Sequence, residues 1–411
     1  MHPKPDAPPA IDKCPAPEGF WMLDPTVTFL NHGSFGSCPR PVIHFQRQIQ
    51  ERMEKQPVTF FVQDLEPLLD SARAELARFL RTRPDDLVFV PNATSGVNAV
   101  LRSLPFSPGD ELLVTDHEYN ASRNALDFVA NRSGATPVVA RIPFPIGSAS
   151  EIVDALLSRV TSRTRLVLID HVTSQTGLVF PIERIVAELN HRGIDSLVDG
   201  AHAPGMLPLN LGALNATYYT GNCHKWICAP KGAGFLVVRP DRQDTIRPNA
   251  ISHGANSHRT DRSRYLIEFG WTGTSDPSAW LSVPEAIRCM GSLDPTGWKG
   301  IHLANRNRTL RARTLLCEAL SIPLPAPDEL IGSLASIPIP DGIPGPPSNS
   351  PLYADPLQDT LRLEYGIEVP VIPWPSAPRR LLRISSQLYN RDSDYQKLAA
   401  ALKELVEKGR L

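Results

Sequence analysis

The feature that most constrains the fold is a succession of short apolar runs, rich in Val, Ile, Leu and Tyr, between residues 86 and 238. Each run has the length of a buried β-strand and is bounded by residues that favour turns. Helical stretches lie between several of them, near 95–103, 119–132, 149–160 and 182–192. Strands separated by helices imply βαβ units, so the sequence predicts an α/β fold with a large, mostly parallel sheet. The runs are DLVFVP, ELLVTD, TPVVARI, RLVLIDHV, SLVDGA, ATYYTGN and GAGFLVV.

The composition shifts after Trp280, where a long helical stretch leads into the strands LASIPIP, EVPVIPW and RLLRISS. With helices near 353–365 and 392–408, this part predicts a smaller α+β C-terminal domain, and 411 residues are enough for two domains. The predicted organisation is a flexible Pro-rich arm over 1–20, a segment over 21–55 that contributes to the small domain and the substrate pocket, a large cofactor-binding domain over 56–290 and a small domain over 291–411.

Charge and composition exclude several classes of partner. The formal net charge is −1 and the charged residues are interspersed, so we expect no nucleic-acid or anionic-lipid partner. No stretch approaches the ~20 apolar residues of a membrane span, and the N-terminus lacks an apolar signal core, which predicts a cytoplasmic protein. Six Cys are too few for a disulfide scaffold. Cys223 and Cys228 have no second pair nearby, so we expect buried thiols and no metal site.

Chemistry is concentrated in VDGAHAPG, residues 198–205, and in GNCHKWICAPKG, residues 221–232. Asp199 ends an apolar strand, where ligands of open α/β sheets bind. An acid that keeps a pyridine nitrogen protonated, a neutral donor for a ring 3-oxygen and an amine for a Schiff base are the groups that hold pyridoxal 5′-phosphate (PLP). Asp199, His202 and Lys225 supply them in that order, although each taken singly has an ordinary structural explanation.

These motifs resemble the class V aminotransferase group of fold-type I PLP enzymes, in the branch of isopenicillin N epimerase and cysteine-derivative lyases. The likeness runs from Phe29 to about Leu402 and follows the family's order through NHGSFG, DHEYNA, VDGAHAPG, GNCHKW, VPEAI and LRISSQLYN. It implies a fold-type I PLP-dependent transferase fold. It also implies that Lys225 carries the Schiff base, that Asp199 pairs with the pyridine nitrogen and that His202 lies near the 3-oxygen.

The cofactor's phosphate is expected at the start of a helix after DLVFVP. Thr94, Ser95 and Gly96 stand where that helix begins, and backbone N–H groups at a helix N-terminus bind phosphate readily. An ordinary N-cap at Thr94 or Ser95 is compatible with this. Asn222 and His224 offer further donors before the lysine. The resemblance also implies that Thr272 or Thr274, in WTGTSD, reaches the phosphate of a neighbouring subunit, which predicts a homodimer with shared active sites.

Further candidates surround the ring and the substrate. The resemblance implies that His117 stacks on the pyridine ring and that Tyr119 distinguishes the epimerase and sulfoxide-lyase branch, with a hydroxyl able to transfer protons. Ser174 and Gln175 are placed to contact the 3-oxygen or the substrate. Arg383 lies in an otherwise apolar strand, where a guanidinium needs an anion; a substrate carboxylate and a structural salt bridge are the alternatives. Asn31 and His32 are expected to shape the substrate pocket.

The resemblance implies removal of the Cα proton from an amino acid, with Lys225 as the base. Reprotonation on the opposite face needs a second acid, Tyr119 or His117, and gives an epimer. Loss of a β-substituent gives the lyase outcome, and transamination is a third alternative. Residues 366–382 contain no Cys, which argues against a cysteine desulfurase. Ser275 stands where the epimerases are expected to carry a charged residue, which weakens the case for a β-lactam tripeptide. A non-enzymatic PLP-fold regulator is disfavoured because no basic DNA-binding segment precedes the fold.

Overall fold

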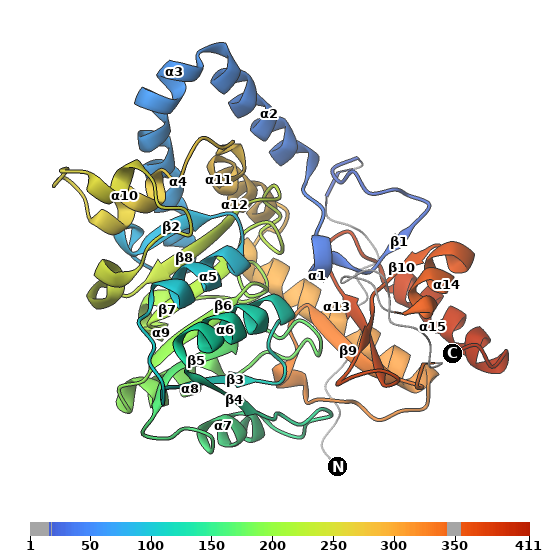
Figure 1. Cartoon of the computed structure of the whole chain (residues 1–411). Coiled ribbons are helices and arrows are strands. Elements are labelled where there is room, and N and C mark those ends of the chain that lie inside the picture. Colours follow the sequence, from blue (N-terminus) through green and yellow to red (C-terminus); the bar gives the residue numbers. More distant parts are fainter. Residues whose placement is uncertain (1–15, 18, 343–354) are drawn as a thin grey trace.

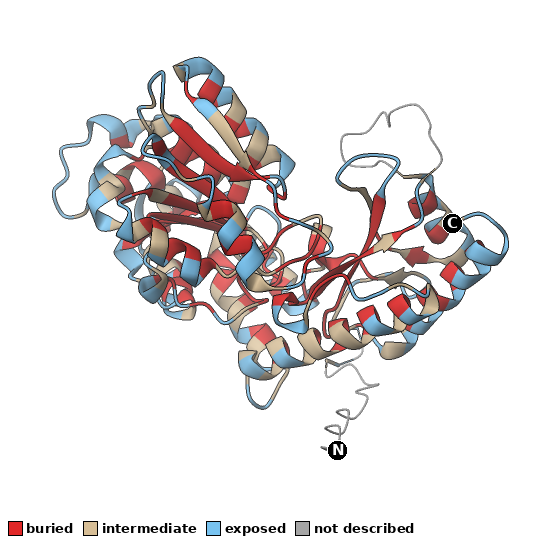
Figure 2. Cartoon of the chain, turned by 90° about the horizontal axis from the view of Figure 1, so that it is seen from below, coloured by how far each residue is buried: buried red, intermediate tan, exposed pale blue. Residues whose placement is uncertain are grey.

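The computed structural model describes residues 16–17, 19–342 and 355–411. Most of the predicted arm over 1–20, the start of the helix predicted near 353–365 and most of the 341–351 loop therefore lie outside the described residues. The described chain forms two domains that meet along a long helix, α13 (Trp298–Ala319), with each domain keeping its own buried strands (Figures 1 and 2).

The large domain is built on a seven-stranded sheet, and all seven predicted strands are present. The order across the sheet is β2-β8-β7-β6-β5-β3-β4, and every neighbouring pair is parallel except those that include β8. β8 follows β7 through a loop without a crossover helix, so it pairs antiparallel. The mostly parallel α/β fold is therefore confirmed. The strands are β2 (Leu87–Val90), β3 (Glu111–Thr115), β4 (Thr136–Ala140), β5 (Thr164–Asp170), β6 (Asp195–Gly200), β7 (Tyr218–Asn222) and β8 (Gly234–Val238).

Helices cover both faces of this sheet because the strands are apolar on both faces. Leu112 and Val114 pack in one core with residues of α5, α6 and α10, whereas Leu113, between them, packs in the other with residues of α4, α7 and α8. That alternation is the period of two of a strand buried on both faces. The helices are α4 (Leu65–Leu80), α5 (Ala93–Ser103), α6 (Asn120–Ser133), α7 (Ala149–Leu157), α8 (Ile182–His191), α9 (Leu211–Leu214), α10 (Arg264–Gly270), α11 (Ser278–Leu281) and α12 (Val283–Gly291).

The small domain has an antiparallel sheet in the order β11-β12-β9. A second, two-stranded sheet pairs β1 in parallel with β10, so a strand near the start of the described chain joins this domain. The helical stretch expected after Trp280 divides into α12 and α13. The small-domain elements are β1 (Thr28–Phe29), β9 (Leu334–Ile339), β10 (Ile367–Glu368), β11 (Val371–Pro373), β12 (Arg380–Ser385), α14 (Pro356–Tyr365) and α15 (Asp392–Glu407).

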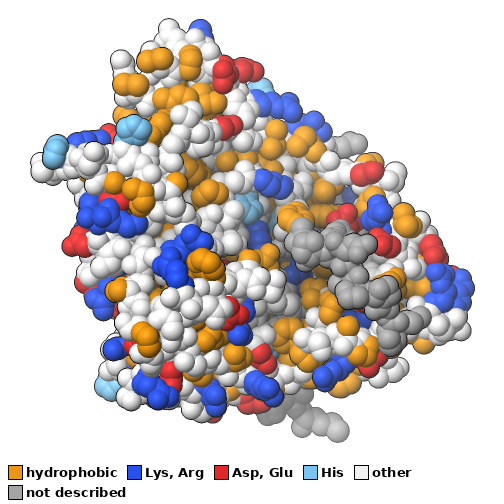
Figure 3. Space-filling model, viewed as in Figure 1, with side chains coloured by type: hydrophobic (Ala, Val, Ile, Leu, Met, Phe, Trp, Pro, Cys, Tyr) orange, Lys and Arg blue, Asp and Glu red, His pale blue; other side chains and the backbone are white. Residues whose placement is uncertain are grey.

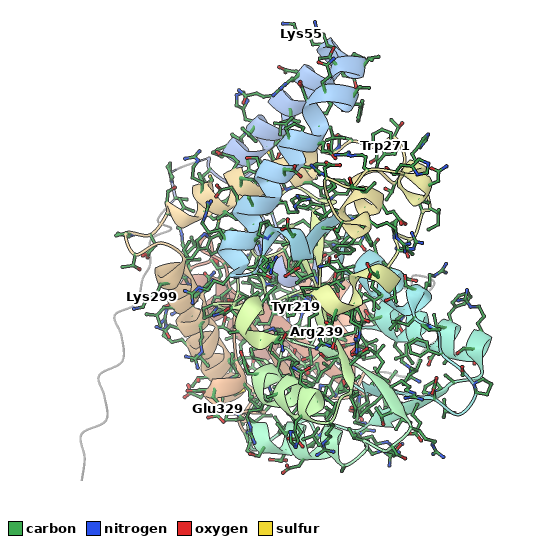
Figure 4. All side chains as sticks on the ribbon, turned by 90° about the vertical axis from the view of Figure 1, so that its left-hand side faces the viewer. Lys55, Tyr219, Arg239, Trp271, Lys299 and Glu329 are labelled. Carbon is green, nitrogen blue, oxygen red and sulfur yellow. The ribbon has the colours of Figure 1, made fainter. Side chains whose placement is uncertain are left out.

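A helical hairpin projects from the large domain. It consists of α2 (Arg40–Lys55), a short α3 (Pro57–Thr59), a π-helical turn over Phe60–Asp64 and α4. Lys55 marks its far end in Figure 4. The four-residue α1 (His32–Phe35) precedes it. Within the described ranges, no helix combines the length and apolar character that crossing a bilayer requires.

Candidate active site

The predicted site residues converge because the strands that carry them end at one edge of the sheet. β2, β3, β5, β6 and β7 run in the same direction, so the segments after their carboxyl ends meet there. Asp199 lies at the end of β6, and Lys225 lies in the loop after β7. Figure 3 shows basic and His side chains gathered where this edge faces the small domain.

Lys225 and His202 form the centre of the site. The Lys225 Nζ lies 3.0 Å from the His202 Nε2. Desolvation lowers the pKa of Lys225 to about 8, and the positive charge of Arg383 acts in the same direction. His202 is buried, and desolvation followed by the charge of Lys225 lowers its pKa well below the usual value. The site therefore holds a neutral imidazole beside an amine that loses its proton far more readily than a surface lysine.

Asp199 is a buried acid with two protein donors. The Ser122 hydroxyl donates to its Oδ2 at 2.7 Å, and the backbone N–H of Ala201 donates to its Oδ1 at 3.0 Å. Burial raises the pKa of Asp199, while these bonds and the charge of Lys225 oppose the shift. A cationic pyridinium nitrogen would compensate the desolvation of this carboxylate, which is the role predicted for Asp199.

Two further buried carboxyl groups, those of Glu118 and Asp170, lie beside Asp199, and neither was predicted from the sequence. Carboxylate oxygens of Glu118, Asp170 and Asp199 lie within 4.8 Å of one another, and all three side chains are buried. Asp170 is the β5 neighbour of Asp199, and Glu118 follows β3. Burial, reinforced by the charges of nearby carboxylates, raises the pKa values of Glu118 and Asp170 well above the ordinary range. The Glu in DHEYNA and the Asp in RLVLIDHV were the available signals.

The start of α5, where the phosphate of PLP is expected, offers only some of the predicted donor groups. Its N-cap is Asn92, whose side chain accepts from the Ser95 N–H at 2.9 Å, and the Gly96 N–H bonds the Asn92 carbonyl. Those two N–H groups therefore already have partners within the helix start. The Thr94 N–H and the hydroxyls of Thr94 and Ser95 are the groups left to meet a phosphate.

The two donors predicted before the lysine have defined local partners. The Asn222 side-chain oxygen accepts from the Ala93 N–H at 2.8 Å and so holds the start of α5 against β7. The His224 Nδ1 donates to the Ala233 carbonyl at 2.9 Å. Desolvation lowers the pKa of His224 to about 4, so its Nε2 is an acceptor until a bound anion favours protonation.

His117 and Tyr119 have different surroundings although they are two residues apart. Both nitrogens of the buried His117 ring are engaged, Nδ1 with the Thr176 hydroxyl at 2.8 Å and Nε2 with the Ile142 carbonyl at 3.0 Å. The ring is held firmly for a stacking role but has no free nitrogen for proton transfer. Tyr119 is 37% exposed and lies near enough to Arg383 to raise the pKa of that guanidinium. Of the two second-acid candidates, the geometry leaves Tyr119.

Arg383 is a buried guanidinium held by neutral groups. Its Nη1 donates to the backbone and side-chain oxygens of Ser174, and its Nη2 donates to the Ser34 hydroxyl at 2.7 Å. Ser174, expected at the 3-oxygen or the substrate, thus contacts Arg383. Desolvation lowers the pKa of Arg383 to about 10. Among the described residues no carboxylate pairs with it, so the salt-bridge alternative is not what the structure shows.

The N-terminal residues expected at the substrate belong to the same segment as Ser34, which bonds this arginine. Asn31 is buried, and its side-chain oxygen lacks a hydrogen-bond partner among the described residues. His32 is fully buried, with Nδ1 2.7 Å from the Tyr389 hydroxyl and Nε2 3.1 Å from the Lys225 carbonyl oxygen. His32 therefore supports the lysine loop, and its ring reaches a substrate only if one of these bonds breaks.

Thr272 and Thr274 lie in an exposed turn. Thr272 lines a pocket of about 480 Å³ that Ser95, Asn249 and Trp280 also line, and Thr274 is exposed. The pocket reaches from the start of α5 to the surface. Figure 4 labels Trp271, the residue that begins this turn. Cys223 and Cys228 are fully buried free thiols, as expected for the C-x4-C pair.

The residues of this site have the chemical groups that PLP binding requires. A buried acid, a neutral imidazole and a partly exposed amine with a lowered pKa lie together beside the N-terminus of a helix. The loops that bring them together depend on close backbone approach. Gly205 has φ +85°, and a Cβ there would lie 2.5 Å from the backbone of Trp226, so the end of VDGAHAPG packs directly on the lysine loop.

Comparison with known proteins identifies the family. The family model for class V aminotransferases matches residues 40–305. The chain is 37% identical to isopenicillin N epimerase from Amycolatopsis lactamdurans, over 93% of this chain and 96% of the relative. It is 30% identical to a probable L-cysteine desulfhydrase, chloroplastic, from Arabidopsis thaliana, over 94% and 84%. These matches confirm the family resemblance read from the motifs.

Solved structures confirm the fold. The cystine C–S lyase C-DES, in complex with its product cysteine persulfide, superposes with a TM-score of 0.74 at 22% identity, covering 92% of this chain and 97% of that one. The cysteine desulfurase CsdA from Escherichia coli superposes with a TM-score of 0.74 at 20% identity, covering 95% and 97%. With its fold-type I architecture and its site residues in the expected order, the chain belongs to the class V aminotransferase family of PLP-dependent enzymes.

Proposed function

We propose that this enzyme removes the Cα proton of an amino acid in epimerase-like chemistry, with C–S lysis of a cysteine derivative as the second candidate and transamination as the third. The observation that supports it most is Arg383, a buried cation without a carboxylate partner among the described residues, which faces the Lys225–His202 pair closely enough to lower both pKa values. A guanidinium so placed suits a substrate α-carboxylate.

In this proposal each residue has a defined task. Bound PLP takes up the negative charge that develops at the substrate Cα. Arg383 holds the carboxylate and orients the Cα–H bond towards the Lys225 amine, which accepts the proton. Asp199 keeps the pyridine nitrogen protonated, His202 donates towards the 3-oxygen and His117 stacks on the ring. On the face opposite Lys225, the Tyr119 hydroxyl is the acid available to return a proton.

The relatives support both leading candidates. Two isopenicillin N epimerases are 37% and 33% identical to this chain, whereas proteins named as L-cysteine desulfhydrases lie between 28% and 31%. The closer identity to the epimerases and the availability of Tyr119 favour the epimerase. Ser275, which lines the pocket beside Thr272, argues against a β-lactam tripeptide as the specific substrate. A cytoplasmic location is part of the proposal.

Incubation with amino acids in deuterated water separates the candidates. Exchange at Cα with inversion and without pyruvate supports the epimerase, and release of pyruvate and ammonia from cysteine derivatives supports the lyase. Accumulation of pyridoxamine phosphate without either result would mean a transaminase. Tyr119→Phe is the companion variant: we expect a loss of inversion of about 10²-fold or more with Cα exchange retained, because only return of the proton needs the second acid. Normal inversion in this variant would remove Tyr119 from the mechanism.

A further inference from the structure

The hydrogen-bond partner of the His202 Nδ1 determines whether the other ring nitrogen, Nε2, carries a proton. The indole Nε1 of Trp226 lies 3.3 Å from the His202 Nδ1, and both side chains are buried. An indole N–H is a donor only, so the Nδ1 must be the acceptor. In a neutral imidazole the single proton then sits on Nε2.

That Nε2–H points into the reaction centre. The two nitrogens lie 3.0 Å apart, and the Lys225 Nζ accepts this bond when its amine is neutral, above about pH 8. An imidazolium would carry a proton on Nδ1 as well and would lose its bond to Trp226. The groups that act electrostatically on the ring are Lys225, Arg383 and His32, and all of them disfavour a positive charge there. The contact with Trp226 and the neighbouring positive charges therefore favour the neutral Nε2–H form of His202.

We propose that Trp226 is a positioning residue whose indole N–H holds His202 in the tautomer that presents its Nε2–H to Lys225 and, in the loaded enzyme, to the 3-oxygen of PLP. The inference rests on the proposed role of His202 but not on which reaction the enzyme catalyses. Trp226 follows Lys225 in the chain. One loop therefore positions the Lys225 amine and, through His202, also directs the proton that faces this amine.

The indole is held firmly enough for this task. Trp226 is fully buried, and its ring lies 4.8 Å, centroid to centroid, from that of His32. Its backbone packs against Gly205, at the end of the segment that carries His202. His32 in turn contacts the carbonyl of Lys225, so the indole cannot turn away from His202 without disturbing the lysine loop.

The first test observes the tautomer directly. Solid-state ¹⁵N spectra of PLP-loaded enzyme labelled only at His, with His202 assigned by its loss in His202→Asn, should show a protonated Nε2 and an unprotonated Nδ1. In Trp226→Phe, which keeps a ring but removes the donor, we expect the two nitrogen shifts to move towards a mixture of tautomers. A protonated Nδ1 in the wild type would overturn the proposal even if the variant does not fold, and so would unchanged shifts in a folded variant.

The second test measures the effect on the cofactor. In Trp226→Phe the pH midpoint of the cofactor's visible absorbance should rise by about 0.5 to 1 pH unit, because the 3-oxygen anion loses part of a charge-assisted hydrogen bond. Trp298→Phe is the matched control, since its indole donates to the Ile287 carbonyl at 3.0 Å and its ring packs against Phe79. That control should leave midpoint and tautomer unchanged. A shifted tautomer with an unshifted midpoint would overturn the link to the cofactor.

Discussion

At the scale of single residues, Lys225 has to be protected from water and yet reachable by a substrate. The structure meets both needs with a partly exposed amine beside His202 whose pKa is lowered to about 8. Schiff-base formation requires the neutral amine, so the reactivity of Lys225 increases with pH. The reactive fraction falls as pH drops below about 8 and approaches its maximum above that value.

We therefore predict that the rate at which cofactor-free enzyme binds PLP covalently rises with pH through about 8 and then levels off. Lys225→Ala should abolish borohydride-trapped cofactor and turnover. Lys231→Ala is the control, because the Lys231 amine bonds the Gly36 carbonyl at the other end of the loop. Stopped-flow absorbance and peptide mapping provide the measurements. Label found on Lys231 would show that the assignment is wrong.

Asp199 provides a second prediction at this scale. Asp199→Asn keeps the shape, but its single amide oxygen can accept only one of the Ser122 and Ala201 hydrogen bonds, and it cannot hold a pyridinium by charge. We expect turnover to fall by about 10²–10³-fold, the usual loss when a preorganised electrostatic partner is removed, while the cofactor still binds. Ser122→Ala should have a smaller effect in the same direction. Near-normal turnover of Asp199→Asn would contradict the electron-sink role.

At the scale of elements, the site depends on how closely α5 approaches β7. A Cβ on Gly96 would lie 2.1 Å from the Thr220 hydroxyl oxygen, which itself bonds the Phe235 carbonyl. There is no room for a side chain there without moving the helix. Since the first turn of α5 is the proposed phosphate end, the same displacement would move Thr94 and Ser95.

Gly96→Ala is accordingly predicted to lower stability by about 1–3 kcal/mol, as overpacking in a core does, and to weaken PLP binding. Gly270→Ala in α10 is the matched control, because a Cβ there meets nothing within 4 Å. Thermal unfolding and cofactor titration of both variants give the comparison. Equal behaviour of the two variants would mean that α5 is not held by this contact.

At the scale of the whole molecule, the turn carrying Thr272 and Thr274 lies at the surface and borders the pocket that includes Ser95. We predict a homodimer in which this turn reaches the phosphate of the partner subunit. Sedimentation at assay concentration should give a dimer, and Thr272→Ala with Thr274→Ala should lower PLP affinity. A fully active monomer would refute the shared site.

Local patterns in the sequence determined the architecture and the chemical groups. Apolar runs separated by helical stretches were enough to predict the parallel sheet, because both faces of such strands must be buried. Parallel strands also bring their carboxyl ends together, so Asp199 and Lys225 could be placed at one edge from their spacing and strand context. The π-helical turn Phe60–Asp64, which joins the two long helices of the projecting hairpin, had no comparable signal.

The tertiary structure decided which nitrogen, oxygen or N–H of each group is free to act. His117 and His32 are ordinary histidines in the sequence, yet both rings are fully engaged by partners distant in the chain. Asn92, rather than Thr94 or Ser95, caps α5. Glu118 and Asp170 join Asp199 only because β3, β5 and β6 lie side by side. Residue type sets what a side chain can do, but its hydrogen-bond partners and burial set what it does, and those come from the folded chain.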